Sequence, residues 1–169
     1  MTTTLTATLA MSLSAVLEKG LDVGSAEYPA NLGITNGFTN GTGANQANEL
    51  FTDTRTLTAS TAENLDLAGV LLDAFGATLT FTKIKAIVIT AAAANTNDVV
   101  VGGHATAAFA PMFGATTDTV VVKPGGTFII VAPDVNGYAV TATTADMLTV
   151  TNGGAGTSVT YTIAIVGVV

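Results

Sequence analysis

A chain of 169 residues with 49% hydrophobic and only 10% charged side chains is long enough for one domain with a sizeable core, but it lacks the charge typical of a free monomer. The absence of cysteine excludes disulfides and thiolate metal sites, and a net charge of -7 without any basic cluster disfavours nucleic-acid binding. We therefore expect much of the surface to face other proteins.

The N-terminal segment alternates apolar and polar residues with a period of two. Odd positions from Leu5 to Leu17 are apolar and the even ones are mostly Thr and Ser, so an extended strand would have one apolar face. A helix with Leu at every fourth position is an alternative, but Thr-rich segments fit a pleated sheet better. We predict a strand, with Leu5, Leu9 and Leu13 as candidate partner contacts.

Residues 21–43 are rich in glycine and show little periodicity, which is typical of a connecting segment. We expect residues 1–43 to form an N-terminal arm and linker, and residues 44–169 to form the body. Such an arm could pair with a neighbouring subunit, as exchanged strands do. No cationic leader is visible and no apolar run reaches the roughly 18 residues of a membrane helix, so we expect neither secretion nor membrane insertion.

The body repeats short strand signals separated by Gly, Pro, Asn and Asp. We expect strands over residues 50–59, 63–67, 78–90, 98–101, 119–122, 127–131, 138–143, 147–151 and 158–169. Residues 69–76 are expected to form a helical turn or a wide loop. Strands at this spacing are typical of a sandwich, a jelly roll or a small barrel, and we predict an all-β protein with a β-sandwich or jelly-roll-like body and an extended N-terminal arm.

The segment at residues 78–90 is the longest strand expected in the body, and its apolar phase slips. Leu79 and Phe81 occupy odd positions, whereas the apolar residues from Ile84 on begin at even ones. A β-bulge near residues 82–83 would return both halves to one core face. The second half is apolar on both faces, so we expect it to lie centrally or at a subunit contact.

The last strand alternates Val, Tyr and Ile against Thr and becomes apolar on both faces at its end. An apolar strand at a sheet edge is unsafe in a monomer, so we expect it to be covered by this subunit or by a second copy. The oligomer interface is expected at Ile87, Ile89, Tyr161, Ile163, Ile165 and Val168.

Side chains that carry catalysis are nearly absent. The single imidazole, His104, follows an expected strand end, where a loop histidine is a simpler interpretation than a metal ligand together with Asp98 or Asp118. No serine lies in a nucleophile elbow, and neither a phosphate-binding loop nor a calcium-binding loop is present. We therefore expect no enzyme activity, no metal and no cofactor.

Two further features are candidate partner contacts. Arg55 is isolated from other basic residues, and its guanidinium could hold a carboxylate across an interface, although an exposed arginine is the simpler interpretation. Phe109, Met112 and Phe113 form an apolar group in a loop, which would serve either to cover the core or to contact a partner.

Turn sequences along most of the chain carry a resemblance to a known group of proteins. They lie at residues 36–48, 52–57, 66–69, 123–128, 132–134 and 152–157. The first contains Asn-Gly-Thr-Gly-Ala-Asn-Gln-Ala-Asn, and the last reads Asn-Gly-Gly-Ala-Gly-Thr. Over residues 36–169 the chain resembles small β-rich structural proteins of tailed bacteriophage virions, most of all the capsid decoration, or cement, proteins.

This resemblance implies a non-enzymatic homotrimer on the capsid surface that bridges major capsid subunits and stabilises the phage head. Its partners would be itself and the major capsid protein, with no nucleic acid and no membrane, and assembly would take place in the host cytoplasm. Two alternatives stay open. A tail-tube or connector subunit would form hexameric rings or tubes, and a carbohydrate- or receptor-binding head-fibre module would expose aromatic residues, for which 3 Tyr and no Trp are a poor signal.

Overall fold

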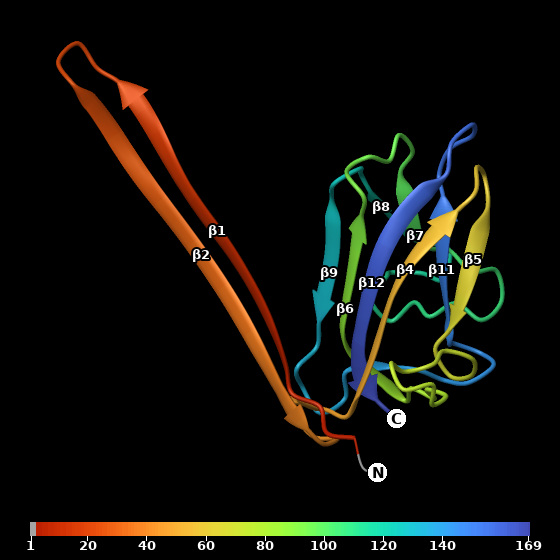
Figure 1. Cartoon of the computed structure of the whole chain (residues 1–169). Coiled ribbons are helices and arrows are strands. Elements are labelled where there is room, and N and C mark those ends of the chain that lie inside the picture. Colours follow the sequence, from red (N-terminus) through yellow and green to blue (C-terminus); the bar gives the residue numbers. More distant parts are fainter. Residues whose placement is uncertain (1–2) are drawn as a thin grey trace.

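The computed structural model describes residues 3–169, which form a body of two facing sheets and a long hairpin that projects from it (Figure 1). The strands within this range are β1 (Ala7–Gly20), β2 (Ser25–Asn40), β3 (Gln46–Ala47), β4 (Glu49–Leu57), β5 (Ala62–Asp66), β6 (Lys83–Ala91), β7 (Val99–Gly102), β8 (Thr119–Val122), β9 (Thr127–Val131), β10 (Tyr138–Ala139), β11 (Met147–Asn152) and β12 (Val159–Val168). Over the same range, no helix has the length and apolar character needed to span a membrane.

The first sheet is built around β12, which pairs antiparallel with β4 on one side and with β6 on the other. The far edge of β6 pairs with β9 over most of its length and with β10 at its start. Both β6 and β12 are therefore interior strands. Of the two positions expected for the second half of residues 78–90, central or at a subunit contact, the structure shows the central one.

The second sheet has the order β5-β11-β7-β8, with antiparallel pairing throughout, and it packs over the first sheet (Figure 1). The prediction of an all-β, sandwich-like body is confirmed. Turn residues lie between most of these strands where the sequence predicted them. Residues 69–76 form a loop, which was one of the two conformations expected.

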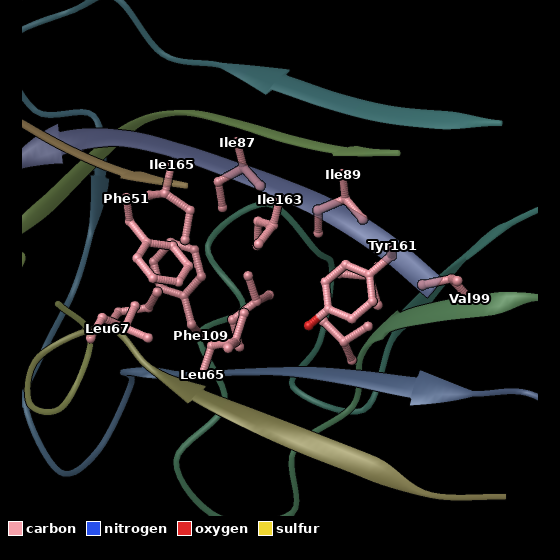
Figure 2. Packing of buried hydrophobic residues seen from close by; sticks show 14 of the residues in the cluster. Phe51, Leu65, Leu67, Ile87, Ile89, Val99, Phe109, Tyr161, Ile163 and Ile165 are labelled. Atoms are coloured by element: carbon pink, nitrogen blue, oxygen red, sulfur yellow. The ribbon is translucent and has the colours of Figure 1, made fainter. Parts of the chain in front are cut away.

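The core lies between the two sheets and is filled by one face of each (Figure 2). From the first sheet it receives Phe51, Leu57, Ile87, Ile89, Tyr161, Ile163 and Ile165, and from the second Leu65, Val99, Val101, Val122, Leu148 and Val150. Every one of these side chains is buried. Each strand contributes alternate residues to the core, as the period of two in the sequence requires.

The phase slip at the start of β6 has a different position from the predicted one. Val166 of β12 lies opposite Ala86, but the next residue, Gly167, lies opposite Ile84, so Lys85 has no partner in the β12 ladder. The irregularity lies at Lys85 rather than at residues 82–83, because Lys83 is the first residue of the strand. Leu79 and Phe81 precede the strand and fill the core from a loop.

Lys85 itself is buried, and its position ties two loops to the sheet. Its Nζ donates hydrogen bonds to the carbonyl oxygens of Gly43, at 3.3 Å, and of Asp134. Burial lowers the pKa of Lys85, and the nearby Asp134 carboxylate opposes that shift. An amine paired with carbonyls in this way satisfies the buried polar group that the irregular strand creates.

The segment expected to be a glycine-rich linker is the second strand of a hairpin. The pairing of β1 with β2 runs without interruption from Ala7 opposite Phe38 to Gly20 opposite Ser25. The connecting turn is closed by a 3.0 Å hydrogen bond from the amide of Leu21 to a carbonyl. At about 3.3 Å per residue, the 14 residues of β1 give this hairpin, here called the arm, a length of about 45 Å.

The root of the arm is anchored on the first sheet. Phe38 is only 1% exposed and forms a small second core with Ala47 and Ala86. β3 adds a short parallel pairing to the end of β2, and the amide of Asn45 donates to the carbonyl of Pro133 at 2.7 Å. The arm therefore leaves the body from a fixed base, and Figure 1 shows its distal part extending away from both sheets.

Candidate interaction surfaces

One face of the arm is apolar along nearly its whole length. It carries the cross-strand pairs Ala7 and Phe38, Met11 and Ile34, Leu13 and Leu32, Ala15 and Ala30, and Leu17 and Tyr28, together with Leu9. We call this set the apolar arm face. Exposure increases away from the root: Leu9 is partly buried, Met11 is 50% exposed, Leu13 59% and Leu17 74%. From Leu13 to the distal end, the side chains of this face are therefore mostly exposed.

The opposite face of the arm is small and mostly polar. Thr, Ser, Gly and Asn predominate there, and the Ser14 hydroxyl donates to the Asn31 side chain at 2.8 Å. The charged side chains Glu18 and Glu27 are paired on this face at the distal end, next to the turn, whereas Lys19 follows Leu17 on the apolar side. The arm is thus an amphipathic two-stranded ribbon, with one face suited to water and one to protein.

Over the region where β4, β12, β6 and β9 lie side by side, the outer face of the first sheet is built from uncharged residues, and Lys83 and Lys85 of β6 lie at its end next to the arm root. It consists of Leu50, Thr52, Thr54 and Thr56 on β4, Ala86, Val88 and Thr90 on β6, Thr127, Ile129 and Val131 on β9, and Thr160, Thr162, Ala164 and Val166 on β12. We call this set the outer sheet face. Its half nearest the arm root is aliphatic, and its far half is threonine.

The threonines form cross-strand pairs that keep their hydroxyls within the sheet. Thr54 bonds Thr162 at 3.0 Å, and equivalent contacts join Thr56 to Thr160 and Thr90 to Thr127. Because these hydroxyls already have hydrogen-bond partners, the free energy needed to remove them from water is low. The threonine half is therefore polar in composition but compatible with contact to another protein.

The apolar arm face and the outer sheet face meet at the root and diverge from there. A hollow of about 260 Å³ lies between Met11 and Ile34 of the arm and Ile129 of β9. A second hollow, of about 280 Å³, lies between Leu9 and the aliphatic half of the sheet at Val166. Both walls of this V-shaped groove are apolar, which is unusual for a surface that faces only water.

The largest group of charged side chains lies elsewhere, at the edge where β4 approaches β5. Arg55 forms ion pairs with Asp53, Nε to Oδ2 at 3.0 Å, and with Glu63, Nη1 to Oε2 at 2.7 Å. The Tyr161 hydroxyl donates to Glu63 Oε1 at 2.6 Å, and burial together with this bond raises the pKa of Tyr161. The Arg55 guanidinium also lies over the Phe51 ring. These contacts are internal and join the two sheets.

The residues predicted to form the oligomer interface are core residues instead. Ile87, Ile89, Tyr161, Ile163, Ile165 and Val168 are all buried within the single subunit. β6 and β12 alternate as the sequence predicts, but the layer that covers these residues is the second sheet of the same chain rather than a second copy. The residues of these strands that remain available to a partner are the intervening ones, which belong to the outer sheet face.

The other predicted contacts divide between the interior and the surface. Leu9 and Leu13 lie on the apolar arm face, and Leu5 packs beside the arm root. Arg55 is bound internally, as described above. Phe109 is buried in the core and Met112 packs against it, so this loop covers the core. Phe113 lies over Gly102, where φ is 105° and a side chain would clash with the ring.

His104 has a local structural role. Its Nδ1 accepts hydrogen bonds from the amides of Thr106 and Ala107, at 3.4 and 3.1 Å, which closes the loop after β7. Neither Asp98 nor Asp118 forms a metal-binding group with it, and residues 3–169 contain no cluster of three or more metal-ligating side chains. Asp98 instead pairs with Lys123 at 2.7 Å.

Sequence reasoning missed the second half of the apolar arm face. Tyr28, Leu32, Ile34 and Phe38 occupy even positions, so a period of two was present there as in the first strand. Glycines on the opposite face hid this signal. A second missed feature is the loop after β5, where Val70, Leu72 and Phe75 are exposed.

Comparisons with known proteins identify no relative of this chain: no family model, curated protein or solved structure matches it.

Proposed function

We propose that the chain is a non-enzymatic structural subunit of a tailed-bacteriophage virion, and that it is a capsid decoration protein that stabilises the head by bridging major capsid subunits. The observation that carries this proposal is the pairing of a projecting apolar arm with an uncharged outer sheet face on one small domain. Surfaces of this kind are typical of subunits whose working state is an assembly.

The low stability expected of the arm in a free subunit supports the same role. A two-stranded hairpin is at best marginally stable in water unless a further layer covers its apolar face. The arm exposes large side chains such as Leu13 and Leu17 along most of its length. A free monomer would leave this surface wet, whereas a subunit in a lattice would bury it against a neighbour.

The chemistry of the body supports a structural rather than a catalytic role. Its main group of charged side chains, around Arg55, is occupied by contacts that hold the two sheets together. His104 is occupied in closing a loop. These side chains have partners already, and their arrangement serves the fold.

The arm also favours a second candidate, a tail-tube or connector subunit. An arm of about 45 Å that projects from a sandwich body is suited to span from one subunit to the next in a ring. The two candidates differ in the number of copies. We expect a trimer, with about three times the 16.8 kDa chain mass, for the decoration protein, and hexamers or tubes for the alternative.

The decisive experiment adds the purified chain to heads of the encoding phage prepared without it. The decoration role predicts co-sedimentation with the heads and ordered density at the joints between capsid subunits in cryo-electron microscopy. A matched control is an arm-shortened variant, in which residues 11–34 are replaced by Asn-Gly so that the paired residues Ala10 and Thr35 flank a tight turn. It should bind heads more weakly. If the full-length chain does not bind heads but forms tubes, the proposal is wrong and the tail-tube subunit is the better interpretation.

A further inference from the structure

We infer that the apolar arm face docks on the outer sheet face of a second copy of this chain. The inference rests on the part of the proposed function that makes the chain an assembly subunit, and it does not depend on the identity of the virion partner. It names the surface on each side of the contact and the way in which copies join.

The subunit does not cover its own arm. Close to the root, Leu9 and Met11 approach β9 and the aliphatic half of the outer sheet face across the two hollows. Beyond this point the arm diverges from the body (Figure 1). Tyr28, on its distal part, is 69% exposed. The exposed part of the face must therefore be covered by another molecule if it is to leave water.

The outer sheet face has the chemistry that this arm requires. It lacks charged groups, so covering it removes no ion from water, and most of its threonine hydroxyls are already paired across strands. The apolar arm face is likewise uncharged as far as Leu17 and Tyr28, with Lys19 beyond them at the distal end, and the acidic residues of the arm lie at its tip and on its opposite face. A charged protein surface would leave unpaired groups against the arm, whereas the sheet of a second copy would not.

Each copy takes part in two contacts, one through its arm and one through its sheet. The arm is about 45 Å long and about 10 Å wide, so one contact covers at most about 450 Å² on each partner, or about 900 Å² in total. This is about half of the roughly 1,600 Å² of a standard specific interface, so a single contact is small. Its repetition in an assembly holds each subunit at two places, which strengthens the whole.

The contact joins two different surfaces, so it is heterologous. Repetition of a heterologous contact closes into a ring when the rotation permits, and otherwise extends as a filament. A trimer or a hexamer would both be built in this way. Two arms that pack face to face would instead give an isolated dimer.

The absence of cysteine from the chain allows a direct test. One preparation carries Leu13→Cys on the apolar arm face, and another carries Val88→Cys on the outer sheet face. The two are mixed, allowed to exchange subunits, and treated with a short bis-maleimide in the absence of any phage particle. We expect a covalent dimer from the mixture and none from either variant alone. Thr162→Cys, at an exposed position, replaces Val88→Cys if the latter disturbs folding.

Two controls test the faces involved. Ser12→Cys lies on the opposite face of the arm, and Val121→Cys lies on the outer face of the second sheet. Neither should cross-link to its counterpart, Val88→Cys or Leu13→Cys. Comparable cross-linking of the controls would overturn the inference.

The other outcomes are equally decisive. Cross-linking of Leu13→Cys with itself would show that arms pair with arms. A third preparation carries Leu13→Cys and Val88→Cys on the same chain, and cross-linking that occurs only within this chain would show that each arm folds onto its own sheet. Either result, or no covalent dimer at all, overturns the inference. Head binding is measured separately, so its loss with intact cross-linking would contradict the capsid role alone.

Discussion

The strands of the body and of the arm both alternate apolar and polar residues, but the apolar residues are buried in the body and exposed in the arm. In the body, alternate residues such as Ile163 and Ile165 are fully buried, because a second sheet lies over them. In the arm, alternate residues such as Leu13 and Leu17 are mostly exposed, because no second layer exists within the subunit. The comparison teaches that alternation defines an amphipathic strand but does not identify what covers it.

This difference has an energetic consequence. The body gains its stability from a closed core between two sheets, so it should fold as an independent unit. The arm has only its strand pairing and its cross-strand side-chain contacts, each of which contributes roughly 0.2 to 1 kcal/mol. We expect the arm to open more readily than the body in a free subunit, and to gain its stability from the neighbour that it contacts.

The largest contrast is expected when the same charged group is placed in each region. Ile165→Asp introduces a carboxylate into the closed core, where an unpaired ion costs several kcal/mol, so the body should be largely unfolded at 25 °C. Leu13→Asp places the same group on the exposed arm face and should leave the body folded while it disrupts self-association. Circular dichroism with thermal unfolding and light scattering measures both effects. If the Ile165→Asp variant were folded but monomeric, Ile165 would have to be assigned to the subunit interface instead of the core.

A second contrast uses two asparagines. Asn152 is buried, donates from Nδ2 to the carbonyls of Thr58 and Thr157 at 3.0 and 2.8 Å, and accepts from Asn97. Asn152→Ala should destabilise the body by about 1 to 3 kcal/mol, because several buried polar groups lose their partner. Asn31→Ala on the exposed arm should change the free energy of unfolding by less than about 0.5 kcal/mol. Equal effects in urea unfolding would contradict the separation of the two regions.

A third contrast uses two tyrosines and a smaller change. Tyr161→Phe removes the hydroxyl that donates to Glu63, and a hydrogen bond to a charged group contributes about 1.5 to 3 kcal/mol. We expect a loss near the lower end of that range, because Arg55 still pairs with Glu63. Tyr28→Phe on the arm is the matched control and should not alter the stability of the body. If Tyr161→Phe is also neutral in urea unfolding, the cluster does not join the sheets as described.

The sequence was sufficient for most of the body. Apolar runs bounded by Gly, Pro and Asn located nearly all of the strands, because those residues both favour turns and interrupt the alternation. The prediction failed at the choice of face in β6 and β12. The same Ile and Tyr residues suit a core and an interface equally well, and only the position of the second sheet decides between them.

The arm was harder to predict for a related reason. The first strand was predicted from its regular Leu and Thr alternation, but Gly33 and Gly37 face the polar side of β2 and gave the appearance of a linker. Among the candidate contacts, Leu9 and Leu13 lie on the apolar arm face, whereas Arg55 and Phe109 have internal partners. The apolar surface of the arm thus depends on a pairing between distant residues that local patterns do not contain.

The smallest effect is expected at the junction between the two regions, where the loop after β9 contacts the arm root. The Asp134 carboxylate accepts the amides of Asn136 and Gly137, at 2.6 and 2.8 Å, and these bonds lower its pKa below the ordinary 3.8. The charged form is therefore favoured by folding, so its contribution to stability is present above pH 3.8 and is lost as the pH falls through the lowered pKa. Asp134→Asn should be slightly less stable than the parent at pH 7, and the gap should close as the pH is lowered to 2. Urea unfolding of both proteins between pH 7 and pH 2 measures this gap. A gap independent of pH would mean that the side chain acts through the shape of the turn and not through its charge.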